Sequence, residues 1–373
     1  RCGGKSSRAA GAGRVVAVRL PRTHEDFLPL LLAVSRCGAA FALMSTDLRE
    51  KELEAERNAL ILAELQPCLV VAADATAEPA GSAKTVAVEA LAAELDSCAA
   101  PQPGGPLATD GRPPPLCFLF TGGTRRTRCA AVTHAMVRHE RGRYAECARL
   151  APPQARVLAS TSVYWGASAL GQLSLALAHG ACAVLCEAQE ADELRAAIAA
   201  EAADVLGLVP DQLRVLAEDP ARELPGVRLV FTWGEALPPS VAERWRGHPA
   251  ARLRELLIST EYWLSLYAAP LEGDGRLMRA VKGARVLVLG EDGQPAREGE
   301  VGELLLAGPM VTSGYLALSG GRGAAGAGAS PFRDVGGERY FCTRDLVRTV
   351  RGGLLEFRGR ADMTTKVKGK WVD

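Results

Sequence analysis

The apolar positions in the first part of the chain follow two alternating rhythms. Within residues 14–65, a β-branched run leads into a helical pattern at 24–36. A short apolar run at 39–44, a second helical pattern at 50–65 and a strand-like run at 68–73 follow. Strands that alternate with helices of this length predict parallel pairing, because each helix carries the chain back along the sheet.

The same alternation returns after Leu116. Apolar runs of four to six residues are the strand candidates, at 116–120, 156–159, 182–186, 205–208, 227–231 and 253–258. Apolar-periodic helices, such as 167–178 and 193–201, lie between them. Before this second half, residues 101–115 carry six prolines and three glycines, a composition typical of a linker.

The pattern changes after about Val281. Short β-like runs separated by glycine-containing turns take over, at 286–289, 303–307, 346–350 and 354–357. This spacing is typical of antiparallel strands in a small barrel or meander. Residues 320–330 consist almost entirely of glycine and alanine, which predicts a flexible loop.

The predicted fold class is therefore α/β, with two doubly wound α/β subdomains and a smaller β-rich, barrel-like subdomain. We place the first α/β subdomain at residues 1–115, including the linker at 101–115. The second α/β subdomain occupies 116–280, and the β-rich subdomain occupies 281–358.

Composition narrows the function classes. Hydrophobic residues make up 48% and charged residues 23% of the 373 positions, as in ordinary globular proteins. The 44 Lys and Arg residues nearly balance the 43 Asp and Glu residues, which argues against a nucleic-acid binder. The longest apolar runs, such as 27–34, are too short to span a membrane. Ten cysteines without a CxxC pair favour a reduced, cytoplasmic chain over a zinc site or a disulfide framework.

A glycine-containing run follows one of the predicted strands. Residues 119–128 (LFTGGTRRTR) combine Gly123 with the hydroxyls of Thr121 and Thr124, and a helix is expected to begin near His134. Glycines let backbone amides approach phosphate oxygens, and the arginines supply positive charge. A Gly/Thr/Arg turn at a sheet edge is more often only a turn, so this run alone leaves both interpretations open.

Two further groups lie where predicted strands end. Thr260 and Glu261 close the strand at 253–258, and a hydroxyl next to a carboxylate suits a phosphate with Mg²⁺. Taken alone, however, such a pair is more often a helix N-cap with an acidic first turn. The turn at 232–237 (TWGEAL) would let a flat ligand pack on Gly234, although a plain turn needs no ligand.

Taken together, these pieces resemble the adenylate-forming superfamily of acyl-CoA synthetases, luciferases and nonribosomal peptide synthetase adenylation domains. LFTGGT resembles the YTSGTTGxPKG phosphate loop, FTWGEAL resembles GGEAL, and ISTEYW resembles YGxTE. VGELLLAGPMVTSGYL resembles GELxxxGxxVxxGYL, YFCTRDLV resembles YxTGDLV, and GRADMTTKVKG resembles GRxDxxxKxxG. The resemblance implies an ATP-dependent enzyme that activates a carboxylic acid as an acyl-adenylate. The acyl group then passes to a thiol of coenzyme A or of a carrier protein's phosphopantetheine.

The resemblance also implies roles for the phosphate side of the site. Thr121, Gly123 and Thr124 would cradle the β- and γ-phosphates of ATP. Thr260 would contact the α-phosphate, and Glu261 would hold Mg²⁺. Thr260 and Glu261 are thus the candidate catalytic residues.

On the nucleoside side, the resemblance implies that Gly234, Glu235 and Ala236 border adenine. Asp345 would bind the ribose hydroxyls, and Arg360 would lie near the ribose. A turn aspartate such as Asp345 would need no ligand to explain it.

The end of the chain resembles the start of the family's small C-terminal domain. Asp362 would be the hinge about which that domain rotates, within residues 359–373. The remainder of that domain, with its catalytic lysine, is absent, so the chain is expected to be a fragment.

The chain departs from the family pattern at several positions. Arginines and other residues at 125–126 and 128–130 replace the second Thr-Gly and the Pro-Lys-Gly of the phosphate loop, so the loop lysine is lost unless an arginine substitutes. Residues 257–258 replace Tyr-Gly, and Arg344 replaces a glycine. The stretch at 160–170 lacks the aspartate that holds an amino-acid ammonium group, which favours an acyl or aryl acid.

Two classes of function stay open on the sequence. The first is an acyl-adenylate-forming enzyme with a divergent loop, which needs a carboxylic acid, ATP, Mg²⁺ and a thiol acceptor. The second is a catalytically degenerate nucleotide-binding or scaffold module of a multidomain protein.

Overall fold

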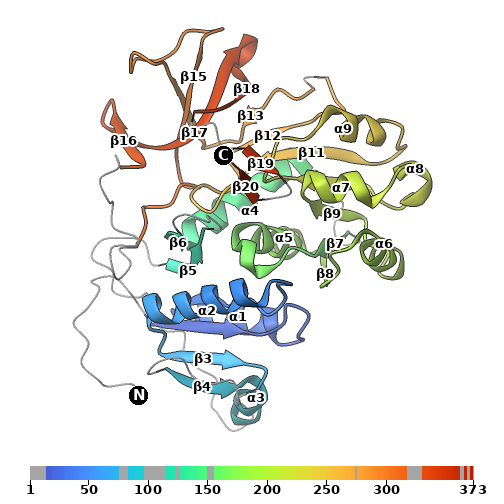
Figure 1. The fold of residues 1–373 in the computed structure, drawn as a ribbon, viewed down its shortest axis with the longest axis vertical. Helices are drawn as coiled ribbons and strands as arrows, with labels where there is room; N and C mark the ends of the chain where they lie inside the picture. Colours follow the sequence, from blue (N-terminus) through green and yellow to red (C-terminus); the bar gives the residue numbers. More distant parts are fainter. Residues whose placement is uncertain are drawn as a thin grey trace.

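The computed structural model describes residues 14–74, 83–95, 115–121, 127–148, 155–273, 275–316, 330–361, 365–367 and 370–372. Three units are stacked along the longest axis of the molecule (Figure 1). The first two are built on mixed, mainly parallel sheets, and the third on an antiparallel sheet. This arrangement confirms the predicted fold class. Most of the expected linker at 101–115 and of the Gly/Ala-rich loop at 320–330 lies outside the described residues.

The first sheet has the strand order β4-β3-β1-β2-β5-β6. All neighbouring strands are parallel except the last pair, β5 and β6. The helices of this unit are α1, α2 and α3. The bounds are β1 (Val15–Arg19), α1 (Phe27–Arg36), β2 (Ala40–Leu43), α2 (Lys51–Leu65), β3 (Leu69–Ala72), β4 (Lys84–Ala87), α3 (Val88–Leu95), β5 (Pro115–Phe120) and β6 (Cys129–Thr133).

Strands β5 and β6 complete this first sheet although they follow the expected linker. Phe41 of β2 pairs with Cys117 of β5, and β5 then pairs with β6. The boundary expected at residue 116 therefore does not coincide with the edge of a sheet. The assignment of residues to domains stays a prediction.

The second sheet has the order β13-β12-β11-β10-β9-β7-β8. Strands β11, β10, β9, β7 and β8 are parallel, and β12 and β13 add an antiparallel edge. The strand bounds are β7 (Arg156–Ala159), β8 (Cys182–Leu185), β9 (Val205–Leu208), β10 (Leu229–Thr232), β11 (Arg252–Leu257), β12 (Leu266–Ala268) and β13 (Arg279–Ala280). The helix bounds are α4 (His134–Ala148), η1 (Val163–Trp165), α5 (Gly166–His179), α6 (Ala191–Ala200), α7 (Pro210–Leu216), α8 (Pro220–Glu223) and α9 (Pro239–Arg246).

Buried side chains explain why the strands of this sheet form. All four residues of β9 and of β10 are buried, as expected for strands covered by helices on both faces. Helix α5 buries nine of its residues, including Leu170 and Leu173, which matches its continuous apolar pattern. The helix ends where Gly180 adopts a left-handed φ of +62°.

The third sheet is antiparallel, with the order β14-β15-β17-β16 and with β18 paired to β17. Its strands are β14 (Arg285–Leu289), β15 (Val301–Ala307), β16 (Phe332–Val335), β17 (Glu338–Val350) and β18 (Leu354–Arg360). A separate two-stranded pair consists of β19 (Thr365–Val367) and β20 (Lys370–Val372). Strand β17 has 13 residues and pairs with three neighbours, so it is the centre of this unit.

A buried ion pair of the first unit makes contacts to the second unit. Arg22 Nη1 lies 2.6 Å from Asp47 Oδ2, and the two side chains are 3% and 6% exposed. Arg22 also donates to the carbonyl of Cys186, and Ser162 donates to Asp47 Oδ1 at 2.6 Å. These contacts fix the segment at 160–165 against the first unit. In the described part of the chain, no helix has the length and apolar character needed to cross a bilayer.

Candidate nucleotide site

A cleft of about 1690 Å³ opens where the three units meet. Its walls contain the residues that follow β5, β10 and β11, together with parts of β17 and β18. The carboxyl ends of the parallel neighbours β10 and β11 share one edge of the second sheet, which explains how the segments that follow these two strands come together. The cleft is lined by every described residue expected in the site: Thr121, Gly234, Glu235, Ala236, Thr260, Glu261, Asp345 and Arg360. Gly123, Thr124 and Asp362 lie outside the described residues.

The turn after β10 has a backbone that favours glycine. Gly234 has a φ of +93°, which a residue with a Cβ rarely adopts. Glu255 of β11 holds the far end of this turn, because its Oε1 accepts from the Leu237 amide at 2.8 Å. Burial raises the pKa of Glu255, while the Leu237 amide and the nearby Arg276 act in the opposite direction. The expected adenine-side turn is thus fixed by a buried carboxylate from the next strand.

Two hydroxyl groups orient the carboxylate of Glu261. Ser259 Oγ donates to Oε2 at 2.5 Å, and Tyr315 Oη donates to Oε1 at 2.6 Å. The Glu261 carbonyl accepts from the Thr312 amide at 2.8 Å, which ties this segment to the residues after β15. Burial, together with the nearby Glu261 charge, raises the pKa of Tyr315, so its hydroxyl keeps its proton and remains a donor.

The oxygen atoms at and around the Glu261 carboxylate suit a Mg²⁺ ion that is bound together with a phosphate ligand. Among the described residues, no group of three His, Cys, Asp or Glu side chains could hold a metal ion. Mg²⁺ differs from zinc in this respect, because it is commonly held by one or two carboxylates plus waters and substrate phosphates. A single oriented carboxylate beside the hydroxyls of Ser259 and Tyr315 meets that requirement.

A buried ion pair crosses β17 and β18 on the opposite wall. Asp345 lies opposite Arg360 in the strand register, and Arg360 Nη1 donates to Asp345 Oδ1 at 2.7 Å. The side chains are 7% and 19% exposed. Tyr262 Oη donates to Asp345 Oδ2 at 3.4 Å. The expected ribose-side residues are therefore held together in one arrangement, with Tyr262 linking them to the segment of Glu261.

The two ends of the expected phosphate loop are bonded to each other. The Thr121 amide donates to the Arg128 carbonyl at 2.8 Å, and the Arg128 amide donates to Thr121 Oγ1 at 3.0 Å. Thr121 thus lines the cleft at the start of this loop. The Thr121 hydroxyl also holds the two ends of the loop together, and this contact does not require a bound phosphate.

Arg57 of α2 lies behind this loop and was not expected in the site. Its Nη2 donates to the carbonyls of Phe120 at 2.6 Å and Tyr164 at 3.0 Å. The guanidinium carbon lies 4.1 Å from the centre of the Tyr164 ring, a cation–π contact. Burial lowers the pKa of Arg57 to about 10, so the group stays charged at neutral pH.

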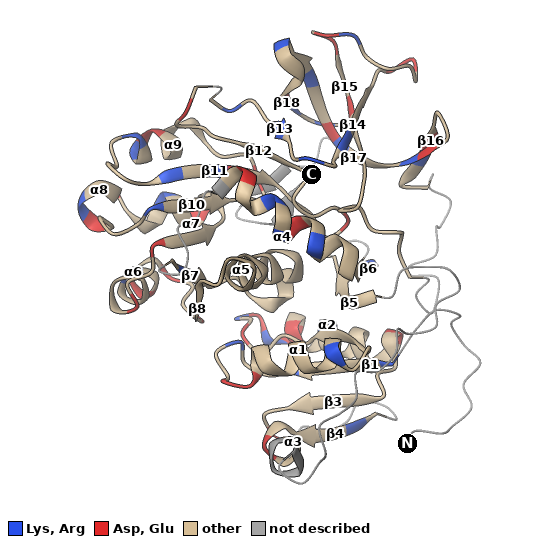
Figure 2. Cartoon of the chain, turned by 180° about the vertical axis from the view of Figure 1, so that it is seen from behind, with Lys and Arg blue, Asp and Glu red and all other residues tan. Residues whose placement is uncertain are grey.

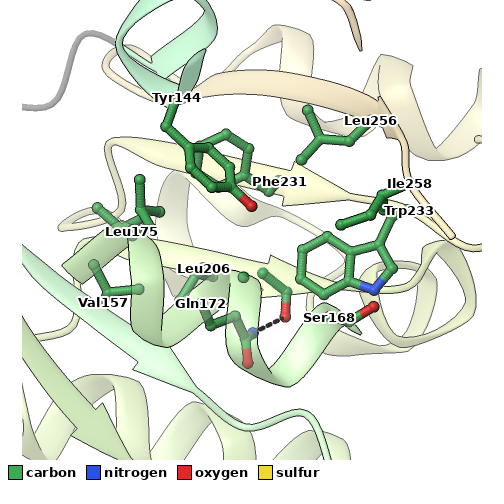
Figure 3. A pocket seen from close by; sticks show the side chains of 13 residues that line it. Tyr144, Val157, Ser168, Gln172, Leu175, Leu206, Phe231, Trp233, Leu256 and Ile258 are labelled. Carbon is green, nitrogen blue, oxygen red and sulfur yellow. Dashed lines mark hydrogen bonds between the residues drawn. The ribbon is translucent and has the colours of Figure 1, made fainter. Parts of the chain in front are cut away.

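Trp233 lies between the cleft and a small apolar cavity beneath it. It lines both spaces, and the cavity of about 10 Å³ has room for about one water molecule. A Cβ at Gly207 of β9 would come within 2.5 Å of the indole and 2.7 Å of Gln172 Nε2. Figure 3 shows the indole beside Gln172 and Ser168, with the Gln172 amide bonded to the Gly207 carbonyl at 2.8 Å. The glycine thus lets the tryptophan close the bottom of the cleft.

The residues that sequence reasoning missed had weak signals. Arg57 and Glu255 are charged residues inside apolar-periodic segments, which is a sign of a buried polar role but does not identify the partner. Tyr315 lies within the VTSGYL run, whose resemblance was noted without a role. Tyr315 lies 54 residues from its partner Glu261, and Arg57 lies 107 residues from its partner Tyr164, so sequence spacing alone could not pair them.

The comparisons with known proteins agree with this geometry. The family model described as "AMP-binding enzyme" matches residues 6–316. The chain is 29% identical over 374 residues to a probable non-canonical nonribosomal peptide synthetase, CymA, of Salinispora arenicola. This match covers 98% of this chain and 5% of CymA. The chain is 28% identical over 338 residues to a sulfoacetate–CoA ligase of Cupriavidus necator, covering 84% of this chain and 63% of the ligase. The chain thus spans less than two thirds of either relative.

A solved structure has the same fold. An artificially fused adenylation–PCP di-domain, NpsA-ThdA from Klebsiella oxytoca, matches with a TM-score of 0.77 and 18% sequence identity. The match covers 97% of this chain and 72% of that chain. At this identity the match establishes the fold alone.

Proposed function

The chain belongs to the AMP-binding enzyme family, and on that premise we propose that it binds ATP and activates a carboxylic acid as an acyl-adenylate. The observation that carries the proposal is the convergence of the Thr121, Glu261 and Asp345 segments on one cleft. These segments are far apart in the chain, and each was expected to contact a different part of ATP.

The nucleoside would lie between the turn after β10 and the Asp345–Arg360 pair. The backbone at Gly234, Glu235 and Ala236 borders one wall and leaves space for a flat base. Asp345 has a carboxylate that can accept hydrogen bonds from two ribose hydroxyls. Arg360 holds that carboxylate in place, because its guanidinium donates at 2.7 Å.

The phosphates would lie between Thr260, Glu261 and the loop that begins at Thr121. Mg²⁺ held at Glu261 would neutralise phosphate charge as the carboxylate of the acid approaches the α-phosphate. Ser259 and Tyr315 keep the Glu261 carboxylate in one orientation. Gly123 and Thr124 are proposed for the same loop on the resemblance alone. The chain's task is to hold two anions in line, and none of its side chains needs to act as a nucleophile.

The acid would enter beside Tyr164 and Trp165, above Trp233. The segment at 160–170 contains no aspartate for an amino-acid ammonium group, which supports an acyl or aryl acid as the substrate. The thiol acceptor would be coenzyme A or the phosphopantetheine of a carrier protein. Support comes from the relatives, one of which is named as a CoA ligase and another as a peptide synthetase. Asp362 stays proposed as the hinge.

Isothermal titration of ATP with Mg²⁺ tests the proposal. We expect the chain to bind ATP at millimolar concentrations or below, and Glu261→Ala to weaken the Mg²⁺-dependent part of this binding about tenfold or more. In the full-length protein, pyrophosphate exchange should depend on both a carboxylic acid and Glu261.

The matched control is Glu56→Ala, because Glu56 lies on the exposed face of α2. Glu56→Ala should leave ATP binding unchanged. If the unaltered chain binds no ATP at millimolar concentrations, the enzyme proposal is wrong and a scaffold function without nucleotide gains support.

A further inference from the structure

Among the described residues, five arginines line the cleft, and one of them has no carboxylate oxygen within 4.0 Å of its guanidinium. Four of them lie within 4.0 Å of a carboxylate: Arg214 with Asp211, Arg276 with Glu255, Arg344 with Glu303 and Arg360 with Asp345. Arg128 also lines the cleft, but within the described part of the chain no carboxylate oxygen comes this close to its guanidinium. A half-buried cation that lines a cleft without a nearby carboxylate is a candidate for binding an anion.

The backbone fixes the position of Arg128. It directly precedes β6, and its amide and carbonyl both bond to Thr121 at the other end of the loop. The next residue, Cys129, accepts at its carbonyl from the Leu316 amide at 2.8 Å. Ala130 forms an isolated antiparallel bridge with Tyr315. Arg128 is therefore held between the phosphate loop and the segment of Tyr315.

The side chain of Arg128 lies against Tyr315. Its guanidinium carbon is 5.0 Å from the centre of the tyrosine ring, and Nη1 donates to the tyrosine hydroxyl at 3.4 Å. That hydroxyl donates in turn to Glu261 at 2.6 Å. Positive charge thus lies on one side of Tyr315, and the proposed Mg²⁺ ligand lies on the other.

The donors of Arg128 are largely unused by the protein. A guanidinium carries five N–H donors in a planar fork that matches two phosphate oxygens. One long hydrogen bond to Tyr315 is the only side-chain bond that the described residues provide for it. Arg128 lines the same cleft as Glu261, where Mg²⁺ and phosphate would be brought together.

We propose that Arg128 binds the β- and γ-phosphates of ATP and supplies positive charge at the end of the divergent phosphate loop. This inference rests on the proposed nucleotide site. It assigns the polyphosphate end to the Arg128 side of Glu261, opposite the Asp345–Arg360 pair. AMP lacks the β- and γ-phosphates, so it should not depend on Arg128.

The test compares ATP, AMP and inorganic pyrophosphate as ligands in calorimetric titrations. Arg128→Ala should weaken ATP and pyrophosphate binding about tenfold or more, because a charge-assisted bidentate contact is lost. AMP binding should stay within about twofold. Arg128→Lys keeps the charge without the fork and should fall between the two proteins. Arg141→Ala, at an exposed position of α4, is the control and should change none of the three affinities.

Each alternative result has a definite meaning. Equal ATP affinity in the unaltered protein and Arg128→Ala would overturn the role of Arg128 while leaving the proposed function intact. A parallel loss of ATP and AMP binding would indicate a structural effect and would also overturn it. If the unaltered chain binds no ATP, the proposed function fails and pyrophosphate decides the role of Arg128. If pyrophosphate binds the unaltered chain and the Arg141→Ala control but not Arg128→Ala, the role of Arg128 is supported. Any other result rejects that role.

Discussion

At the scale of single residues, Arg344 occupies a backbone conformation that favours glycine. Its φ is +66°, at a position where the resembling TGD motif has glycine. A left-handed conformation costs an ordinary L-residue roughly 1–2 kcal/mol. Its ion pair with Glu303 is long, at 3.9 Å, and Arg344 is 55% exposed, so little stability is gained in return.

Arg344→Gly should therefore stabilise the chain. Glycine removes the cost of the left-handed conformation, but it also makes the unfolded chain more flexible, which destabilises the fold by about 0.5–1 kcal/mol. The net gain in the free energy of unfolding should therefore be about 0.5–1 kcal/mol. Urea denaturation measures it. Gln66→Gly, at the left-handed end of α2 far from the cleft, is the control and should shift stability in the same direction. A loss of stability in Arg344→Gly would show that the arginine side chain contributes more than its backbone costs.

Glu140 of α4 is a fully buried carboxyl whose contacts are poor. Its Oε1 accepts from the Leu264 amide and the Tyr144 hydroxyl at 3.5 Å each, and its Oε2 has no partner in the described structure. Burial raises the pKa of Glu140 to about 8, well above the value of 4.5 for an ordinary glutamate. The folded protein therefore prefers the protonated carboxyl, whereas the unfolded chain ionises above pH 4.5.

This shift predicts a pH-dependent effect of Glu140→Gln. The contribution of the neutral carboxyl to stability is complete below about pH 4.5 and is lost as the pH rises to about 8. Glutamine stays neutral, so its advantage over glutamate should grow from pH 5 to pH 8, on the order of a few kcal/mol. Thermal unfolding across this range measures the difference, with exposed Glu56→Gln as control. A difference that is constant with pH would contradict the buried, protonated state.

At the scale of elements, Arg57 connects three of them. It lies on α2 and donates to the last residue of β5 and to Tyr164 in η1. The phosphate loop starts directly after β5. Helix α2 of the first unit therefore positions both this loop and the segment of Tyr164 in the second unit, beside which the acid is proposed to enter. This buried guanidinium thus donates to backbone carbonyls of both elements.

Removing that connection should destabilise the elements it joins. Arg57→Met removes the guanidinium donors from these carbonyls and should lower the free energy of unfolding by about 2–3 kcal/mol. Arg57→Lys keeps one donor group and should recover part of the loss. Urea denaturation measures both, and exposed Arg36→Met on α1 should change little. If Arg57→Lys proved as damaging as Arg57→Met, the planar fork rather than the charge would be the essential feature.

Element positions were more predictable than their partners. The strands at 156–159 and 205–208 were predicted at the positions where β7 and β9 occur, because buried parallel strands are short continuous apolar runs. The return of β5 to the first sheet was not predictable, since pairing with β2 depends on contacts 76 residues apart, from Phe41 to Cys117. The candidate site shows the same difference between local positions and distant partners. Motif residues such as Asp345 were predicted, whereas Glu255 and Arg57 act through distant backbone groups that a local pattern does not contain.

At the scale of the whole molecule, positive and negative residues are mixed in the described part of the chain. Figure 2 shows Lys and Arg interspersed with Asp and Glu along the helices of the second unit and on the antiparallel strands. Many of these residues form i,i+3 pairs, such as Arg214 with Asp211 and Arg246 with Glu243. Exposed pairs of this kind add little stability each. Within the described residues, Arg128 lines the cleft and Arg57 is buried behind the phosphate loop, and neither has an ion pair with a carboxylate.

The cleft has a consequence for how the chain acquires its ligand during synthesis. Its walls run from Thr121, at the end of the first sheet, to Arg360 in the last strand of the third. A growing chain folds from its N-terminus, so the first two sheets can form while β17 and β18 are still to be made. Until those strands emerge, the cleft lacks the wall that carries Asp345. Tight nucleotide binding would therefore be acquired in a single late step, when the nascent chain closes its third sheet over the other two.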